Sequence, residues 1–172
     1  MPQMVDHYLT KPDQLSFIEA MHHHRSYVWV NASTDWGISI IKGRLWVAWR
    51  LRTGWRSDGR DIGWAESITL ELAVIWLMRD GYMDCNITIH SDNMGVIGAF
   101  DKGCSCNIAH NDSIQRTASA IIPNNITISP VYLLSASNRA DPISCSILGP
   151  LSLHLQELLQ LPEELTPFLT YI

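Results

Sequence analysis

The chain has 172 residues, of which 47% are hydrophobic and 17% are charged; this suits one globular domain and excludes an intrinsically disordered chain. Its 12 lysine and arginine residues against 17 aspartate and glutamate residues give a formal net charge of −5, so the overall charge offers no attraction to nucleic acid. No apolar run reaches the ~18 residues of a membrane span, and the N-terminus lacks a signal-peptide pattern. We therefore expect no membrane association and an intracellular protein, cytoplasmic or nuclear rather than secreted.

Residues 1–25 are expected to form an N-terminal leader, either a short helix or a linker. Asp13 can cap a helix that ends in the three consecutive histidines His22, His23 and His24. Adjacent side chains on a helix point about 100° apart, so these three do not converge on one metal ion. The four cysteines of the chain have neither zinc nor disulfide spacing, and we expect them to be reduced thiols.

After residue 25 the sequence changes to short runs rich in β-branched and aromatic residues. Residues 27–30, 38–41 and 45–51 are each typical of a strand. Turn residues separate them. Three short strands with tight connections predict an antiparallel meander.

Helices and strands alternate in the rest of the chain. Residues 64–81 predict a helix of about four turns that ends at Gly81, a residue suited to the position after a helix. The later elements, in chain order, are a strand over 86–90, helices over 93–102 and 111–122, a strand over 126–134 and a final helix over 150–161. Helices between the later strands imply crossover connections, so we expect an α/β fold with a mixed sheet that is partly parallel.

Polar side chains stand at the ends of several of these elements. Asn31 ends the first strand, and Asp92 follows the fourth. Glu66 lies near the start of the long helix, and Asp141 follows the last strand. Open α/β sheets commonly bind ligands at such strand ends. Each acid alone would be an ordinary solvated cap, so it is their joint order that indicates a site.

Four segments, VWVNASTDWG, IGWAES, IHSDN and SNRADPIS, together resemble ribonuclease H domains of reverse-transcribing retroelements, above all retrotransposons of the kind found in fungal genomes. The resemblance covers residues 26–147. It implies an α/β, ribonuclease H-like fold, with a five-stranded mixed sheet whose first three strands are antiparallel and whose faces carry helices. The order of the acids argues against the related transposases and integrases, in which the catalytic glutamate comes last. Residues 148–172 remain as a C-terminal helical tail, packed on the domain or against a missing neighbour.

The resemblance also implies a reaction, the hydrolysis of the RNA strand of RNA–DNA hybrids by two Mg²⁺ ions, for which Mn²⁺ can substitute. It makes Asn31, Glu66, Asp92 and Asp141 the catalytic and metal-binding positions. Carboxylates suit this chemistry because hard cations prefer oxygen ligands. Glu71 is a rival to Glu66, since the two are about 140° apart on a helix and cannot both face one site. The Trp-x-Glu context favours Glu66.

Asn31 stands where the family has aspartate. A neutral amide offers one oxygen and bridges two dications poorly, so we expect the rate to fall by orders of magnitude. The sequence therefore indicates an impaired nuclease. The alternative is a catalytically dead nucleic-acid-binding or structural remnant of a retrotransposon polyprotein, and a third reading is another nuclease of the superfamily, such as a DNA exonuclease. Asp35, in the next turn, is a conceivable but weak substitute.

Two explanations compete for Asn31. It is either an introduced substitution that traps metal or substrate, or one lesion in a decayed element. Other departures from the family pattern favour decay, and each is reachable by one C→T or G→A transition: cysteine for arginine at Cys145, serine for glycine at Ser39, leucine for proline at Leu134, and Cys104 and Cys106 in an expected arginine-containing stretch.

Positive charge gathers over residues 42–60, which hold six of the twelve cations, interleaved with tryptophans. One hypothesis is a solvated hairpin whose tryptophans cover the core. The other is a basic surface that binds phosphates, with contacts from Arg44, Arg50, Arg52, Asn93 and Asn138. The expected partners are an RNA–DNA hybrid or another nucleic acid, and the reverse transcriptase domain of the same polyprotein.

Overall fold

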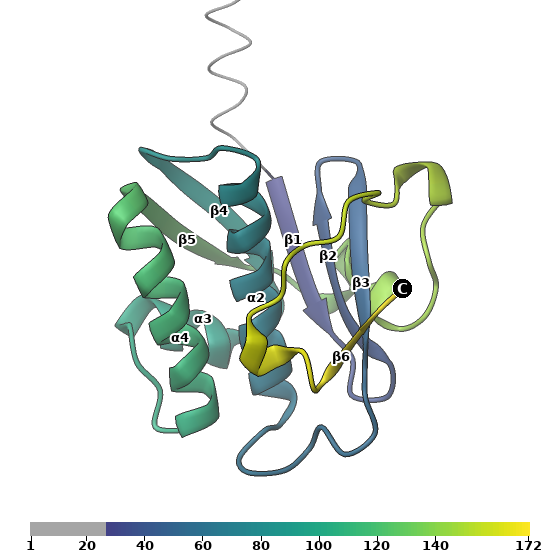
Figure 1. The fold of residues 1–172 in the computed structure, drawn as a ribbon, viewed down its shortest axis with the longest axis horizontal. Coiled ribbons are helices and arrows are strands. Elements are labelled where there is room, and N and C mark those ends of the chain that lie inside the picture. The colour runs from purple at the N-terminus through teal and green to yellow at the C-terminus, as the bar shows by residue number, and fades with distance from the viewer. Residues whose placement is uncertain (1–26) are drawn as a thin grey trace, which may run out of the picture.

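The computed structural model describes residues 27–172, so the expected leader and its histidines lie outside the described residues. Six strands form one sheet in the order β5-β4-β1-β2-β3-β6, and the longer helices cover one of its faces (Figure 1). Within this range, no helix is both long enough and apolar enough to span a membrane.

The first three strands form the expected antiparallel meander. β1 (Tyr27–Ala32) pairs with β2 (Gly37–Lys42), and β2 pairs with β3 (Leu45–Leu51). A Cβ atom at Gly37 would lie 2.1 Å from the carbonyl oxygen of Trp49. Only glycine therefore permits this close approach of the two strands.

The second half supplies the parallel part of the sheet. β4 (Cys85–Ser91) runs parallel to β1, and β5 (Ile126–Tyr132) runs parallel to β4. The connections are helical, as predicted, and consist of α2 (Ile62–Arg79), α3 (Met94–Lys102) and α4 (Ile108–Ile121).

Side-chain caps set the ends of these helices. Asp61 accepts a hydrogen bond from the Trp64 backbone N–H, so α2 begins two residues before the predicted start. At the other end of α2, Gly81 has a φ of 85°, as its predicted position requires. Asn107 accepts from the Ala109 backbone N–H, and α4 begins three residues before its predicted start for the same reason.

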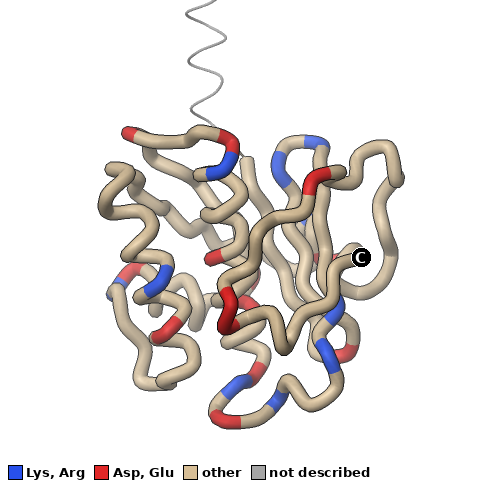
Figure 2. The backbone as a smooth tube through the Cα atoms, in the orientation of Figure 1, with Lys and Arg blue, Asp and Glu red and all other residues tan. Residues whose placement is uncertain are grey.

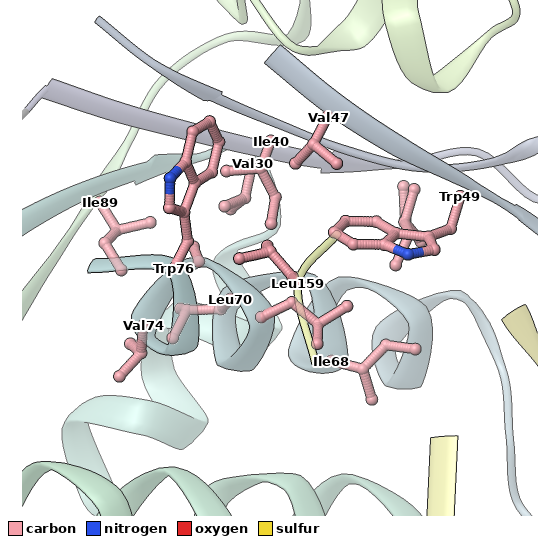
Figure 3. Close-up of a cluster of buried hydrophobic side chains, with 14 of the residues drawn as sticks. Val30, Ile40, Val47, Trp49, Ile68, Leu70, Val74, Trp76, Ile89 and Leu159 are labelled. Atoms are coloured by element: carbon pink, nitrogen blue, oxygen red, sulfur yellow. The ribbon is translucent and has the colours of Figure 1, made fainter. Parts of the chain in front are cut away.

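The main core lies between the sheet and α2. α2 is buried on nearly every side because the sheet contacts one flank and α4 packs on another. Figure 3 shows side chains of this cluster, which come from α2, from four strands and from the C-terminal segment: Val30, Ile40, Val47, Trp49, Ile68, Leu70, Val74, Trp76, Ile89 and Leu159.

The prediction of a C-terminal helix was wrong. After a short 3₁₀ turn at Leu151–Leu153, the chain crosses the molecule without an α-helix and ends in β6 (Leu169–Tyr171), which pairs antiparallel with β3. The sheet thus has six strands rather than the expected five. The Leu155 N–H donates to the Trp46 carbonyl of β3, so tertiary hydrogen bonds replace helical ones. The tail covers an edge that β3 would otherwise expose.

The tail offers a matched pair of substitutions, because Leu159 is 4% exposed in the core and Leu158 is 67% exposed. We expect Leu159→Ala to lower the free energy of unfolding by about 2–4 kcal/mol, and Leu158→Ala to change it by less than about 0.5 kcal/mol. Urea denaturation of both variants measures this. Equal effects would mean that the tail does not pack on the domain in solution.

Candidate active site

Four segments that are far apart in the sequence meet at one open pocket. Asn31 comes from the end of β1, and Glu66 from the second turn of α2. Asp92 follows β4, and Asp141 begins the short helix α5 (Asp141–Ser144). All four side chains line the pocket. It opens at the C-terminal ends of the parallel strands β1 and β4, where ligands bind in open α/β sheets.

The amide of Asn31 is buried and fully hydrogen-bonded. The side chain is 3% exposed. Its Nδ2 donates to Asp141 Oδ1 at 3.0 Å and to Ser144 Oγ at 2.7 Å. Its Oδ1 accepts from Asn138 Nδ2 at 3.3 Å. Both polar atoms are therefore engaged within the protein, and the amide N–H group sits against a carboxylate.

Asn93 lines the pocket, and Asn138 makes hydrogen bonds to residues that line it. Asn138, predicted to contact nucleic acid, is 3% exposed and donates to the carbonyl of Val30 at 2.9 Å. The same Nδ2 lies 3.4 Å from Asp92 Oδ1, so this side chain positions the site from inside. Asn93 lines the pocket and caps α3 by accepting from the backbone N–H of Val96 at 3.1 Å.

Glu66 is a buried carboxyl group whose hydrogen bonding is incomplete. Its Oε1 accepts the Ala32 backbone N–H at 2.8 Å, whereas Oε2 is buried and has no partner. Burial, assisted by the negative charges of Asp92 and Asp141, raises the pKa of Glu66 to about 8 against the opposing effect of the Ala32 bond. With no cation bound, this pKa favours the protonated form of Glu66 at neutral pH.

These residues do not fit a pair of divalent cations. Two ions in one site require oxygen ligands on all sides, but Asn31 presents an N–H group to Asp141, and its oxygen already accepts from Asn138. Among residues 27–172, no three His, Cys, Asp or Glu side chains form a group that could hold a metal ion. Hydrogen bonds donated by Asn31 and Asn138 link the side chains of this acidic pocket instead.

The two candidate glutamates face different parts of the molecule. Glu71 is 2% exposed and faces α4, where Arg116 Nε donates to its Oε1 at 2.7 Å and Ser113 Oγ donates to its Oε2 at 2.7 Å. Only Glu66 of the two lines the pocket. This separation agrees with the 140° angle predicted from their spacing.

Glu71 is either a structural partner of Arg116 or a residue of the site, and the Glu71→Gln variant distinguishes these two roles. Because this substitution leaves the partly exposed Arg116 guanidinium unpaired, we expect the free energy of unfolding to fall by about 1–3 kcal/mol. Urea denaturation of the single and double variants, with Arg116→Gln as the second change, isolates the pair. If Glu71→Gln changed binding of an RNA–DNA hybrid in a protein that remains folded, Glu71 would belong to the site.

The structure separates the predicted basic residues. Arg44, Arg50 and Arg52 are all exposed. Arg44 lies in the turn between β2 and β3, whereas Arg50 and Arg52 lie at the opposite end of β3, and Figure 2 shows Lys and Arg positions at both ends. Arg52 Nε donates to Thr170 Oγ1 at 3.0 Å. These arginines therefore do not form one surface.

The interleaved tryptophans belong to the interior. Trp46, Trp49 and Trp55 are between 0% and 6% exposed. They pack in the two hydrophobic clusters, as the first of the two hypotheses for this stretch predicts. They offer no rings to a nucleic acid.

Sequence reasoning missed several residues of the site, among them Ser144, Tyr132 and Met94. Ser144 Oγ accepts a hydrogen bond from the Asn31 amide. Ser144 belongs to the SNRADPIS segment, but nothing in that segment indicated a contact with Asn31. Tyr132 and Met94 line the pocket while remaining 46% and 62% exposed. Tyr132 is the last residue of β5, and its position at the end of a parallel strand is the signal that would have identified it.

Comparison with known proteins identifies the fold. No protein-family model matches the chain, and no curated protein matches it either. Among solved structures, the chain is similar to RNase H1 from the halophilic archaeon Halobacterium salinarum, with 18% sequence identity and a TM-score of 0.51. The match covers 72% of this chain and 96% of the archaeal one. The chain therefore has a ribonuclease H-like α/β fold, here with a sheet of six strands.

Proposed function

We propose that this chain is a ribonuclease H-type nuclease domain from a retroelement polyprotein, built to hydrolyse the RNA strand of RNA–DNA hybrids and impaired by Asn31. One observation carries the proposal. The four positions that the sequence motifs single out, Asn31, Glu66, Asp92 and Asp141, come from four separate elements and line the same pocket. The similarity to an RNase H1 structure supports the fold in which such a pocket would act.

We assign a cofactor only to a form of the site that has aspartate at position 31. Folds of this class generally use divalent metals, and an aspartate at position 31 would complete a set of four carboxyl groups of the type that hard cations prefer. Two Mg²⁺ ions, with Mn²⁺ as a substitute, are the cofactors we assign to that form. The proposed partners are the hybrid and the reverse transcriptase domain of the same polyprotein, with action inside the cell.

A second candidate is a remnant that binds nucleic acid without cutting it. It is favoured by the Asn31 amide, whose hydrogen bonds to Asp141, Ser144 and Asn138 complete the site without a metal. On this reading the fold has been kept and the chemistry lost. The exposed Cys145, which stands where the family has arginine, fits the same history.

Side-by-side assays of this chain and the Asn31→Asp variant on a labelled RNA–DNA hybrid separate the candidates. Cleavage by the variant in Mg²⁺ or Mn²⁺, with little or none by the chain, supports the nuclease. Hybrid binding by both proteins without cleavage by either supports the remnant. Equal cleavage of plain DNA would point to another nuclease of the superfamily.

A further inference from the structure

The second face of the sheet, opposite α2, is divided into two halves. Over β2 and β3 it is covered, because Ala140 and Ile143 pack on Ile41, Trp46 and Ala48. Over β4 and β5 the side chains that point to this face are exposed or half-buried, namely Asn86, Thr88, His90, Thr127, Ser129 and Val131. The open half begins at β1.

Three aromatic rings and one arginine stand together on β1 and β4 in this open half. Trp29 and His90 are direct partners across the strands, and their ring centroids lie 5.1 Å apart with planes at 16°. The ring of Tyr27 lies 6.1 Å from Trp29 and 6.4 Å from His90. The guanidinium of Arg139 lies 4.4 Å from the centroid of Trp29.

This group has the exposure and charge of a ligand-binding surface. Tyr27 is 52% exposed, and Arg139 is also exposed. No carboxylate points to this face from β1, β4 or β5, although the whole chain has a net charge of −5. Arg139 donates to the Gly43 carbonyl at 3.3 Å and makes no ion pair within residues 27–172. Cross-strand packing accounts for Trp29 against His90, whereas Tyr27 and Arg139 contact this pair and still leave much of their own surface exposed.

We infer that Tyr27, Trp29, His90 and Arg139 form a stacking platform that binds single-stranded nucleic acid. Bases stack on aromatic side chains without regard to sequence, and an arginine beside them adds a phosphate contact. Tyr27 and Trp29 share their face of β1 with Asn31, so the platform extends about 13 Å from the pocket along this strand at ~3.3 Å per residue. A strand that leaves the pocket in this direction crosses the rings.

The test is the binding of a fluorescein-labelled oligothymidylate of about 15 nucleotides, measured by anisotropy with the full chain and no divalent metal. We expect Tyr27→Ala and Arg139→Gln each to weaken binding at least about fivefold. Arg139→Gln should also reduce the salt dependence by about one phosphate contact. Tyr27→Phe keeps the ring and should bind as the parent chain does.

Arg56→Gln is the matched control, because Arg56 also lies over a tryptophan, 5.2 Å from the centroid of Trp55, and is not part of the platform. Thermal melting checks that each variant is folded. The inference is overturned if the chain does not bind the oligonucleotide, or if Tyr27→Ala and Arg139→Gln bind it as tightly as Arg56→Gln does. It does not depend on cleavage. The Asn31→Asp variant could fail to cut a hybrid while the chain still binds the oligonucleotide through Tyr27 and Arg139. This outcome would refute the proposed function and support the platform.

Discussion

The Asn31→Asp variant should cleave an RNA–DNA hybrid in Mg²⁺ at least about 100-fold faster than the chain itself, because one missing electrostatic partner in a catalytic site typically costs 10²–10³ in rate. The substitution replaces the amide N–H group that now faces Asp141 with a carboxylate oxygen. Single-turnover cleavage of a hybrid labelled on the RNA strand measures the ratio. Asn31→Ala is the control, since it removes the amide without adding a charge and should not cleave.

The same variant should lose stability until a metal is present. Without metal, the introduced carboxylate would lie about 3 Å from that of Asp141, and the two hydrogen bonds donated by the amide would be lost. Like charges at this distance oppose ionisation and folding. We therefore expect the melting temperature of the variant to lie below that of the chain and to rise with Mg²⁺, as binding to the folded state requires. The melting temperature of the chain should respond little. Cleavage by the unaltered chain at the rate of the variant would contradict the role given to Asn31.

The elements with strong local signals could be predicted from the sequence. The β-branched and aromatic runs of the meander, the long helix that ends at Gly81 and the strand before Asp92 were all found within a few residues of their observed bounds. The signals there are local, namely turn glycines, caps and alternation, and the tertiary structure agrees with them.

The C-terminal tail shows why the rest could not be predicted. Its leucines recur at helical spacing, but this segment forms no α-helix. Four of its leucines are nevertheless buried, namely Leu155, Leu159, Leu165 and Leu169. The Leu155 N–H bonds to β3, and residues 169–171 pair with that strand. These partners lie more than a hundred residues away along the chain, and no local pattern indicates them.

In the candidate site, too, local features could be predicted from the sequence and contacts between distant segments could not. The Trp-x-Glu context favoured Glu66 over Glu71, and their spacing predicted that the two face different directions, because both are properties of one helix. The hydrogen bonds of Asn31 to Ser144 and Asn138 depend on how α5 and the preceding loop pack beside β1. Ser39 is a further example, since its Oγ donates to the Ala140 carbonyl at 2.7 Å and so links the start of α5 to β2.

A pH-dependent stability follows from Glu66. Its pKa rises from 4.5 to about 8 on folding, so between these values the folded state binds more protons than the unfolded state. Stability then falls as pH rises. The contribution is fully present below about pH 4.5 and lost above about pH 8, a total of up to about 5 kcal/mol. Glu66→Gln is neutral at every pH and should remove this slope.

Denaturant unfolding of the chain and of Glu66→Gln from pH 5 to 9 tests this, because the difference between them cancels the other titrating groups. Asp61 and Asp80 have a pKa lowered below 3.8 and titrate outside the window. Burial lowers the pKa of His154, which adds an opposite trend that both proteins share. Parallel curves would show that Glu66 is ionised throughout. In that case the ionised carboxylate would need partners for its buried Oε2 that residues 27–172 do not supply.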